Sequence, residues 1–155
     1  SRLIHYRARE EMIAYVIRLA GNPVSESACA TLIESMNKSS CGVYDVVFDA
    51  VTPDETDSLM DSLRLKWKYP SPGRVETVTV KGVTLELTGY AGRDVRKRVA
   101  CALSHYLLWR LAARTDEPLL ILEHDALFTR CFEWTASDLR AFSDERGGVI
   151  IALND

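Results

Sequence analysis

The sequence predicts an α/β fold with a mostly parallel β-sheet flanked by helices. Two patterns support this prediction: strand-like runs alternate with helical patterns along the chain, and residues 119–122 form a short, wholly apolar run after a proline. The alternation is typical of βαβ units, in which crossover helices join parallel strands. The apolar run is typical of a strand buried on both faces, so we expect 119–122 to lie centrally in the sheet.

The N-terminal part of the chain predicts one complete βαβ unit. Residues 13–19 and 44–48 are rich in β-branched and aromatic side chains, which is typical of strands. Between them, Ser25 is the expected N-cap of a helix that runs to Lys38. Apolar residues recur at helical spacing along it, at Ala28, Leu32, Ile33 and Met36.

A helix-start signal and a hairpin signal follow. Thr52 is the expected N-cap of a helix that runs to about Lys66, because Pro53 follows it and Glu55 completes a capping box. Two alternating runs that flank Lys81-Gly82 predict a β-hairpin beside the main sheet, with strands at 75–80 and 83–87.

Helical patterns dominate the C-terminal part. The longest one covers 93–114 and has a single apolar stripe, and it leads into the strand at 119–122. A short helix capped by Thr135 is expected to reach about Phe142, and 148–153 predict a last strand.

Composition restricts the classes of protein. A chain of 155 residues with 47% hydrophobic and 26% charged residues is ordinary for a globular protein, and a net charge of −3 argues against a wholesale nucleic-acid binder. We find no apolar run of membrane-spanning length and no signal-peptide pattern. The four cysteines form no CxxC pair, which favours free thiols and a cytoplasmic location.

The expected domain organisation is simple. Residues 1–11 are polar and basic and precede Met12, so we expect a leader or an expression-derived segment there. We expect 12–155 to form a single domain.

The strand at 119–122 runs directly into Glu123, His124 and Asp125. Open α/β sheets bind ligands beyond the carboxyl ends of their strands. Side chains two apart on extended backbone point the same way, so Glu123 and Asp125 can share one cation while His124 faces elsewhere. The alternative is a solvated acidic loop.

A basic cluster opens the longest helix, at Arg93, Arg96, Lys97 and Arg98. It can clamp a diphosphate or an anionic acceptor. The alternative is a solvated helix face.

Several of these stretches together resemble glycosyltransferase family 25, which includes lipopolysaccharide-modifying and collagen galactosyltransferases. The helix contains Cys101, Ser104 and His105 where the family has a Cys-x-x-Ser-His-like stretch. The strand ends in Leu122-Glu-His-Asp125, similar to the family's Leu-Glu-Asp-Asp-like motif. Tyr15-Val-Ile-Arg-Leu19 and Phe48-Asp-Ala-Val51 resemble the family's first two strands.

The chain departs from the family pattern in four places. His124 replaces the middle Asp, Arg18 replaces an Asn, and residues 21–25 replace an Arg-rich loop. Family domains usually continue beyond the position of Asp155, so the expectation is either a C-terminally truncated domain that lacks the acceptor half or a minimal member of the family. Short, phage-associated members of the family resemble this chain most.

The resemblance implies a GT-A-like fold and a metal-dependent glycosyltransferase. Such an enzyme moves a sugar from a nucleotide-diphosphate donor, a UDP-sugar, to a saccharide or other hydroxyl acceptor. It also implies that Glu123 and Asp125 hold Mn²⁺ (or Mg²⁺), an ion that neutralises the leaving diphosphate. Mn²⁺ tolerates a nitrogen ligand better than Mg²⁺ does, although we expect a supporting role for His124.

The resemblance further suggests roles for single residues. We expect His105 to act in catalysis as a hydrogen-bond donor to the donor phosphates or to a metal ligand, and Asp155 to be the general base. The expected donor-binding residues are Tyr15, Arg18, Ser104 and Arg96. The alternatives to a catalytic role are structural, since a helix histidine is most often structural and a mid-helix serine often bonds back to its own helix.

Two other functions remain open from the sequence. One is a non-catalytic GT-A-like protein that binds a sugar, a nucleotide or a protein partner. The other is a phage glycosyltransferase that acts on modified DNA bases, which would use the basic cluster.

Overall fold

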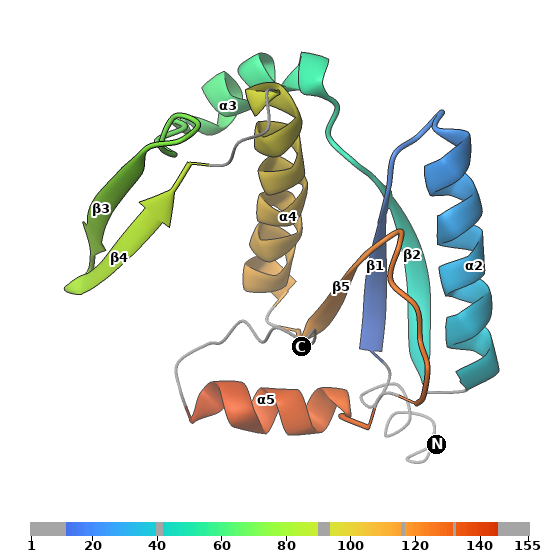
Figure 1. Ribbon diagram of the computed structural model, residues 1–155. Coiled ribbons are helices and arrows are strands. Elements are labelled where there is room, and N and C mark those ends of the chain that lie inside the picture. Colours follow the sequence, from blue (N-terminus) through green and yellow to red (C-terminus); the bar gives the residue numbers. More distant parts are fainter. Residues whose placement is uncertain (1–11, 40–41, 90–93, 116, 132, 146–155) are drawn as a thin grey trace. The chain divides into compact units, whose positions relative to one another are not determined.

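The computed structural model describes residues 12–39, 42–89, 94–115, 117–131 and 133–145. The chain divides into two compact units. The first contains the residues up to Ala50 and those from Ser104 onward, and the second is Val51–Leu103. Strands and helices alternate along the chain (Figure 1), so the predicted mixed α/β class is confirmed.

The first unit is built on a parallel sheet of three described strands. They are β1 (Met12–Arg18), β2 (Val43–Asp49) and β5 (Leu119–Glu123), in the order β2-β1-β5. The predicted central position of the 119–122 strand is therefore wrong for the described part of the sheet, where β1 is central. Four of the five β5 residues retain partial or full exposure, which is typical of a strand at the edge of the sheet as far as its strands are described.

Helix α2 (Pro23–Ser39) joins β1 to β2 and covers one face of the sheet (Figure 1). Its N-cap is Asn22, not Ser25 as predicted, because the Asn22 side chain accepts hydrogen bonds from the backbone N–H groups of Val24 and Ser25 at 3.1 Å. Ser25 is buried, and its hydroxyl accepts a hydrogen bond from the backbone N–H of Leu19 at 2.9 Å. This side chain therefore ties the helix to the end of β1.

The core lies between α2 and the covered face of the sheet. It comprises alternate residues of β1 and one stripe of α2, together with a β5 residue: Met12, Ala14, Val16, Cys29, Leu32, Met36 and Leu120. Leu32 and Met36 were predicted from their helical spacing, whereas Cys29 was not. Burial raises the pKa of the Cys29 thiol, so this side chain packs as a small neutral hydrophobe.

Leu32 provides a direct test of this core. It is 0% exposed, so Leu32→Ala leaves a cavity and should destabilise the protein by about 2–5 kcal/mol, measured by urea unfolding. The control is Val24→Ala on the same helix, since Val24 is 77% exposed. Equal losses in the two variants would contradict the assignment of Leu32 to the core.

The second unit opens with the predicted helix start. The Glu55 carboxylate accepts hydrogen bonds from the backbone N–H and the hydroxyl of Thr52, both at 2.7 Å. A 3-10 turn, η1 (Pro53–Glu55), leads into α3 (Thr56–Leu63). The helix ends before the predicted Lys66, because Arg64 adopts a left-handed conformation with a φ of 55° and its N–H bonds back to the last turn.

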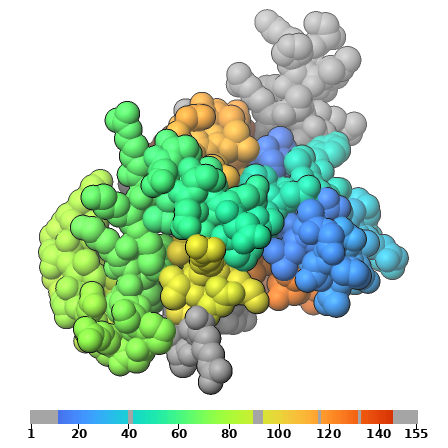
Figure 2. Space-filling view, turned by 90° about the horizontal axis from the view of Figure 1, so that it is seen from above, coloured from blue at the N-terminus to red at the C-terminus, as the bar shows by residue number. Residues whose placement is uncertain are grey.

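The predicted hairpin is confirmed as β3 (Val75–Val80) paired antiparallel with β4 (Val83–Thr88). Lys81 and Gly82 both have positive φ, which is typical of a type I′ turn between two twisted strands. Most hairpin side chains lie at the surface (Figure 2, green to yellow-green). A Cβ on Gly89 would lie 2.0 Å from the carbonyl oxygen of Ser71, so the base of the hairpin requires glycine there.

Two further helices complete the described chain. Helix α4 (Val95–Thr115) matches the longest predicted helical pattern, and α5 (Ala136–Asp144) matches the helix predicted after Thr135. Among the described residues, no helix combines the length and apolarity that a membrane span requires. The strand predicted at 148–153 lies outside the described residues.

The cap of α5 predicts a pH dependence. The Asp138 carboxylate accepts hydrogen bonds from the backbone N–H and the hydroxyl of Thr135, which lower the pKa of Asp138. Because a lowered pKa stabilises the ionised form, this stabilisation is present above the ordinary aspartate pKa of about 3.9 and is lost as the pH falls through the lower folded value.

A carboxyl ¹³C titration checks this sign. The midpoint of Asp138 should lie below about 3.9 in the wild type and should rise in Thr135→Ala, which removes the hydroxyl donor. Thr115→Ala, at the end of α4, is the control and should leave the midpoint unchanged. An unchanged midpoint in Thr135→Ala would contradict the capping role of the hydroxyl.

Candidate functional site

The three described strands of the first unit, β1, β2 and β5, are parallel, so their carboxyl ends meet at one edge of the sheet. Polar residues end all three: Arg18 in β1, Asp49 in β2 and Glu123 in β5. Asp49 is the register partner of Arg18, and Glu123 is the partner of Ile17. This edge is where open α/β sheets bind ligands.

Arg18 and Asp49 form an ion pair at this edge. The Nη2 and Nε atoms of Arg18 lie 2.6 and 3.0 Å from the same carboxylate oxygen of Asp49. This hydrogen bonding raises the pKa of the Arg18 guanidinium. Arg18 therefore stays charged with a fixed orientation, and the pair links the ends of β1 and β2.

Glu123 lies on the sheet face opposite α2. Side chains alternate along a strand, and Leu120 and Leu122 pack in the core on the α2 side. The Glu123 side chain therefore points to the other face, where it retains 53% exposure. A carboxylate in this position is accessible to a ligand.

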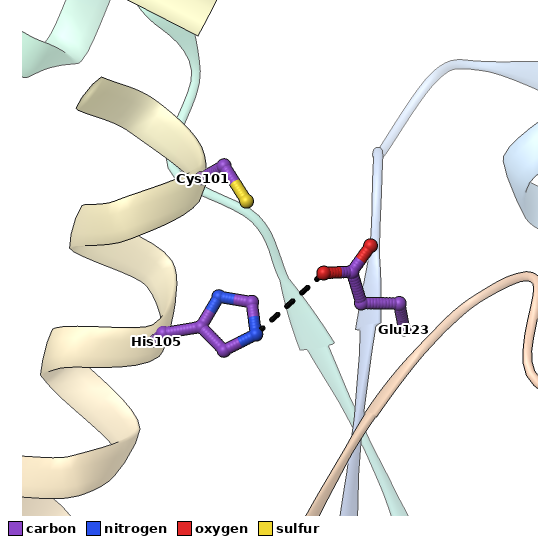
Figure 3. A group of neighbouring side chains, drawn as sticks. All are labelled: Cys101, His105 and Glu123. Atoms are coloured by element: carbon purple, nitrogen blue, oxygen red, sulfur yellow. Dashed lines mark ion pairs between the residues drawn. The ribbon is translucent and has the colours of Figure 1, made fainter. Parts of the chain in front are cut away.

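His105 is the neighbour of Glu123 on that face. Its Nε2 atom lies 3.7 Å from the Glu123 carboxylate, and its side chain is 25% exposed. Cys101 lies one helical turn before His105 on α4. The ligand atoms of Cys101, His105 and Glu123 all lie within 4.8 Å of one another (Figure 3).

Asp125 is placed differently from the expectation. The expected alignment of Glu123 and Asp125 required extended backbone, but β5 ends at Glu123 and the chain turns at His124 and Asp125. The backbone N–H of Ala126 closes this turn onto the carbonyl of Glu123 at 3.0 Å. Strand alternation therefore does not align the two carboxylates, although both are exposed close to the same edge.

Asp125 is also outside the group in Figure 3. Among the described residues, the group of Cys101, His105 and Glu123 is the one set of three or more Cys, His, Asp or Glu side chains that come this close together. His124, expected to face away from the carboxylates, is partly buried.

The other candidate residues are dispersed. Ser104 is 1% exposed, and Tyr15 is half-buried in the middle of β1. Arg96 forms an ion pair with Asp57 at 3.1 Å within the second unit, and Lys97 lies 3.8 Å from Asp94. Part of the basic cluster is thus neutralised by neighbouring acids. Arg93 and Asp155 lie outside the described residues.

Two residues of the candidate site, Cys101 and Asp49, were not predicted from the sequence as site residues. Cys101 was noted only as part of a motif, although residues spaced as Cys101 and His105 share one helix face. Asp49 was not linked to Arg18, because no local pattern pairs the ends of two strands that are distant in sequence.

Residues 39–151 match the family model described as glycosyltransferase family 25 (LPS biosynthesis protein). No curated protein and no solved structure shows a significant match to the sequence.

Proposed function

Because the chain belongs to glycosyltransferase family 25, we propose that it transfers a sugar from a UDP-sugar to a saccharide or other hydroxyl acceptor on a GT-A-like fold. The family match establishes the class of enzyme, a glycosyltransferase. The observation that carries the finer proposal is the position of Glu123, an accessible carboxylate at the carboxyl edge of a parallel sheet.

The donor set suits a hard divalent cation. Carboxylate oxygens are preferred by Mn²⁺ and Mg²⁺, and Glu123 and Asp125 are both exposed near the end of β5. In the proposal these two residues hold Mn²⁺ (or Mg²⁺), which when bound neutralises the charge that develops on the departing UDP.

His105 has an orienting role in this proposal. Its Nε2 atom lies 3.7 Å from the Glu123 carboxylate, so a small side-chain movement brings the imidazole N–H within hydrogen-bonding reach. A histidine that donates to a metal-binding carboxylate holds that carboxylate in the geometry for binding. Its partial exposure also leaves it accessible to a phosphate of the donor.

The remaining residues of the proposal are donor contacts and a general base. Two nitrogens of the Arg18 guanidinium donate hydrogen bonds to Asp49, and its other N–H groups can donate to a phosphate. Three further residues are proposed to bind the donor. Tyr15 lies on β1, and Ser104 precedes His105 on α4. Arg96 offers its guanidinium to a donor phosphate. Asp155 is the proposed general base that removes the proton of the acceptor hydroxyl.

The acid partners of Arg96 and Lys97 weaken the alternative of a DNA-binding surface.

Calorimetry of UDP binding with and without Mn²⁺ tests the donor site. We expect binding that requires Mn²⁺, with an affinity at least about tenfold weaker in Asp125→Ala, because the variant removes a direct metal ligand. The matched control is Asp54→Ala, which removes an exposed carboxylate from the second unit and should bind as the wild type does.

Two results would contradict the proposal. If the folded protein does not bind UDP, the assignment of a donor site is wrong. If Mn²⁺-dependent binding is unchanged in Asp125→Ala, Asp125 is not part of that site. Release of UDP from a UDP-sugar in the presence of Mn²⁺ separates a catalytic protein from one that only binds the donor.

A further inference from the structure

We propose that Cys101, His105 and Glu123 form a binding site for a borderline-soft divalent cation of the Zn²⁺ class. The three residues supply a thiol sulfur, an imidazole nitrogen and a carboxylate oxygen, and these ligand atoms all lie within 4.8 Å of one another (Figure 3). Sulfur and nitrogen ligands are preferred by Zn²⁺, whereas Mg²⁺ and Mn²⁺ prefer oxygen. This site therefore selects a different ion from the proposed donor site.

The spacing of the imidazole nitrogen and the carboxylate oxygen fits such an ion. Bonds of about 2.0–2.1 Å from Zn²⁺ to nitrogen and oxygen place the two atoms about 3.3–3.5 Å apart at a tetrahedral centre. The observed separation of His105 Nε2 and Glu123 Oε1 is 3.7 Å, which is longer than a hydrogen bond and close to this value. A small adjustment of two partly exposed side chains then brings both atoms to the ion.

The backbone holds the three residues in place. Cys101 and His105 lie one turn apart on α4, so the helix itself puts both side chains on one face. His105 and Glu123 belong to the same compact unit, and Glu123 is the last residue of a strand paired with β1. The ligands thus come from regular elements rather than from loops.

Exposure at the site allows exchange of the ion with solvent. Cys101 is exposed and Glu123 is half-exposed. When Zn²⁺ binds, the thiol releases its proton to solvent and the thiolate becomes the ligand. Three protein ligands leave a fourth position for water or another oxygen ligand, as in zinc sites with an open coordination position.

The site also bears on the proposed sugar transfer. Glu123 is shared between this site and the proposed donor cation, so a Zn²⁺-class ion at Cys101 and His105 withdraws Glu123 from Mn²⁺. This consequence, inhibition by competition for one carboxylate, rests on the proposed function. The thiol-containing site itself stands independently of it.

Titration of the reduced 155-residue chain with Co²⁺ tests the site. Co²⁺ takes the place of Zn²⁺, and a thiolate ligand adds a near-ultraviolet sulfur-to-cobalt charge-transfer band. We expect this band in the wild type, its loss in Cys101→Ser, and its displacement by Zn²⁺. His105→Ala and Glu123→Gln should each weaken Co²⁺ binding by at least the roughly 10–100-fold that accompanies loss of a residue that only supports a ligand.

Matched controls separate this site from other thiols and from the donor site. Cys131→Ser removes another exposed cysteine and should keep the band. Asp125→Ala should also keep the band although it weakens Mn²⁺-dependent UDP binding, so the two proposals fail independently. Circular dichroism verifies that each variant is folded.

Three outcomes would overturn the inference. They are the absence of a charge-transfer band in the folded wild type, a band that persists in Cys101→Ser, and a band that is lost in Cys131→Ser instead. If Glu123→Gln leaves tight Co²⁺ binding unchanged, Glu123 is not a ligand of this site, and the predicted competition with Mn²⁺ is wrong as well.

Discussion

The parallel pairing of β1 with both β2 and β5 is the constraint on which the first unit depends. Residues of β1 form hydrogen-bonded registers with strands that lie about 30 and 100 positions further along the chain. Because parallel strands need crossover connections, α2 is forced onto the sheet between β1 and β2. The core formed by Met12, Ala14, Val16 and the buried stripe of α2 follows from that placement.

The same pairing assembles the candidate site. Parallel strands bring their carboxyl ends together, so Arg18, Asp49 and Glu123 reach one edge although they are distant in sequence. Alternation along β5 then puts Leu120 and Leu122 in the core and Glu123 on the opposite face. One residue of difference in register would bury the carboxylate and expose a leucine, so the site and the core depend on the same hydrogen bonds.

Glu123 belongs to two different sets of proposed metal ligands. Asp125 offers a second hard oxygen ligand close by in sequence, and α4 offers a soft sulfur and a nitrogen through Cys101 and His105. Under the two proposals, the cation that Glu123 binds depends on which ions are available, since softness of the ligands rather than charge separates the two sets. One carboxylate of this glycosyltransferase family 25 chain thus serves two kinds of ion under the two proposals.

Local signals in the sequence determined the helix starts at Thr52 and Thr135, the Lys81-Gly82 turn and the extents of most strands and helices. Capping and turn chemistry act over a few residues, so they can be read without the fold. The tertiary structure alone decided that β1 is the central described strand, that Asn22 rather than Ser25 caps α2, and that Arg18 pairs with Asp49. It also decided that His105 and Cys101, rather than Asp125, come together with Glu123. These outcomes depend on contacts between distant segments and on where β5 stops being extended, and no periodicity or local spacing specifies either one.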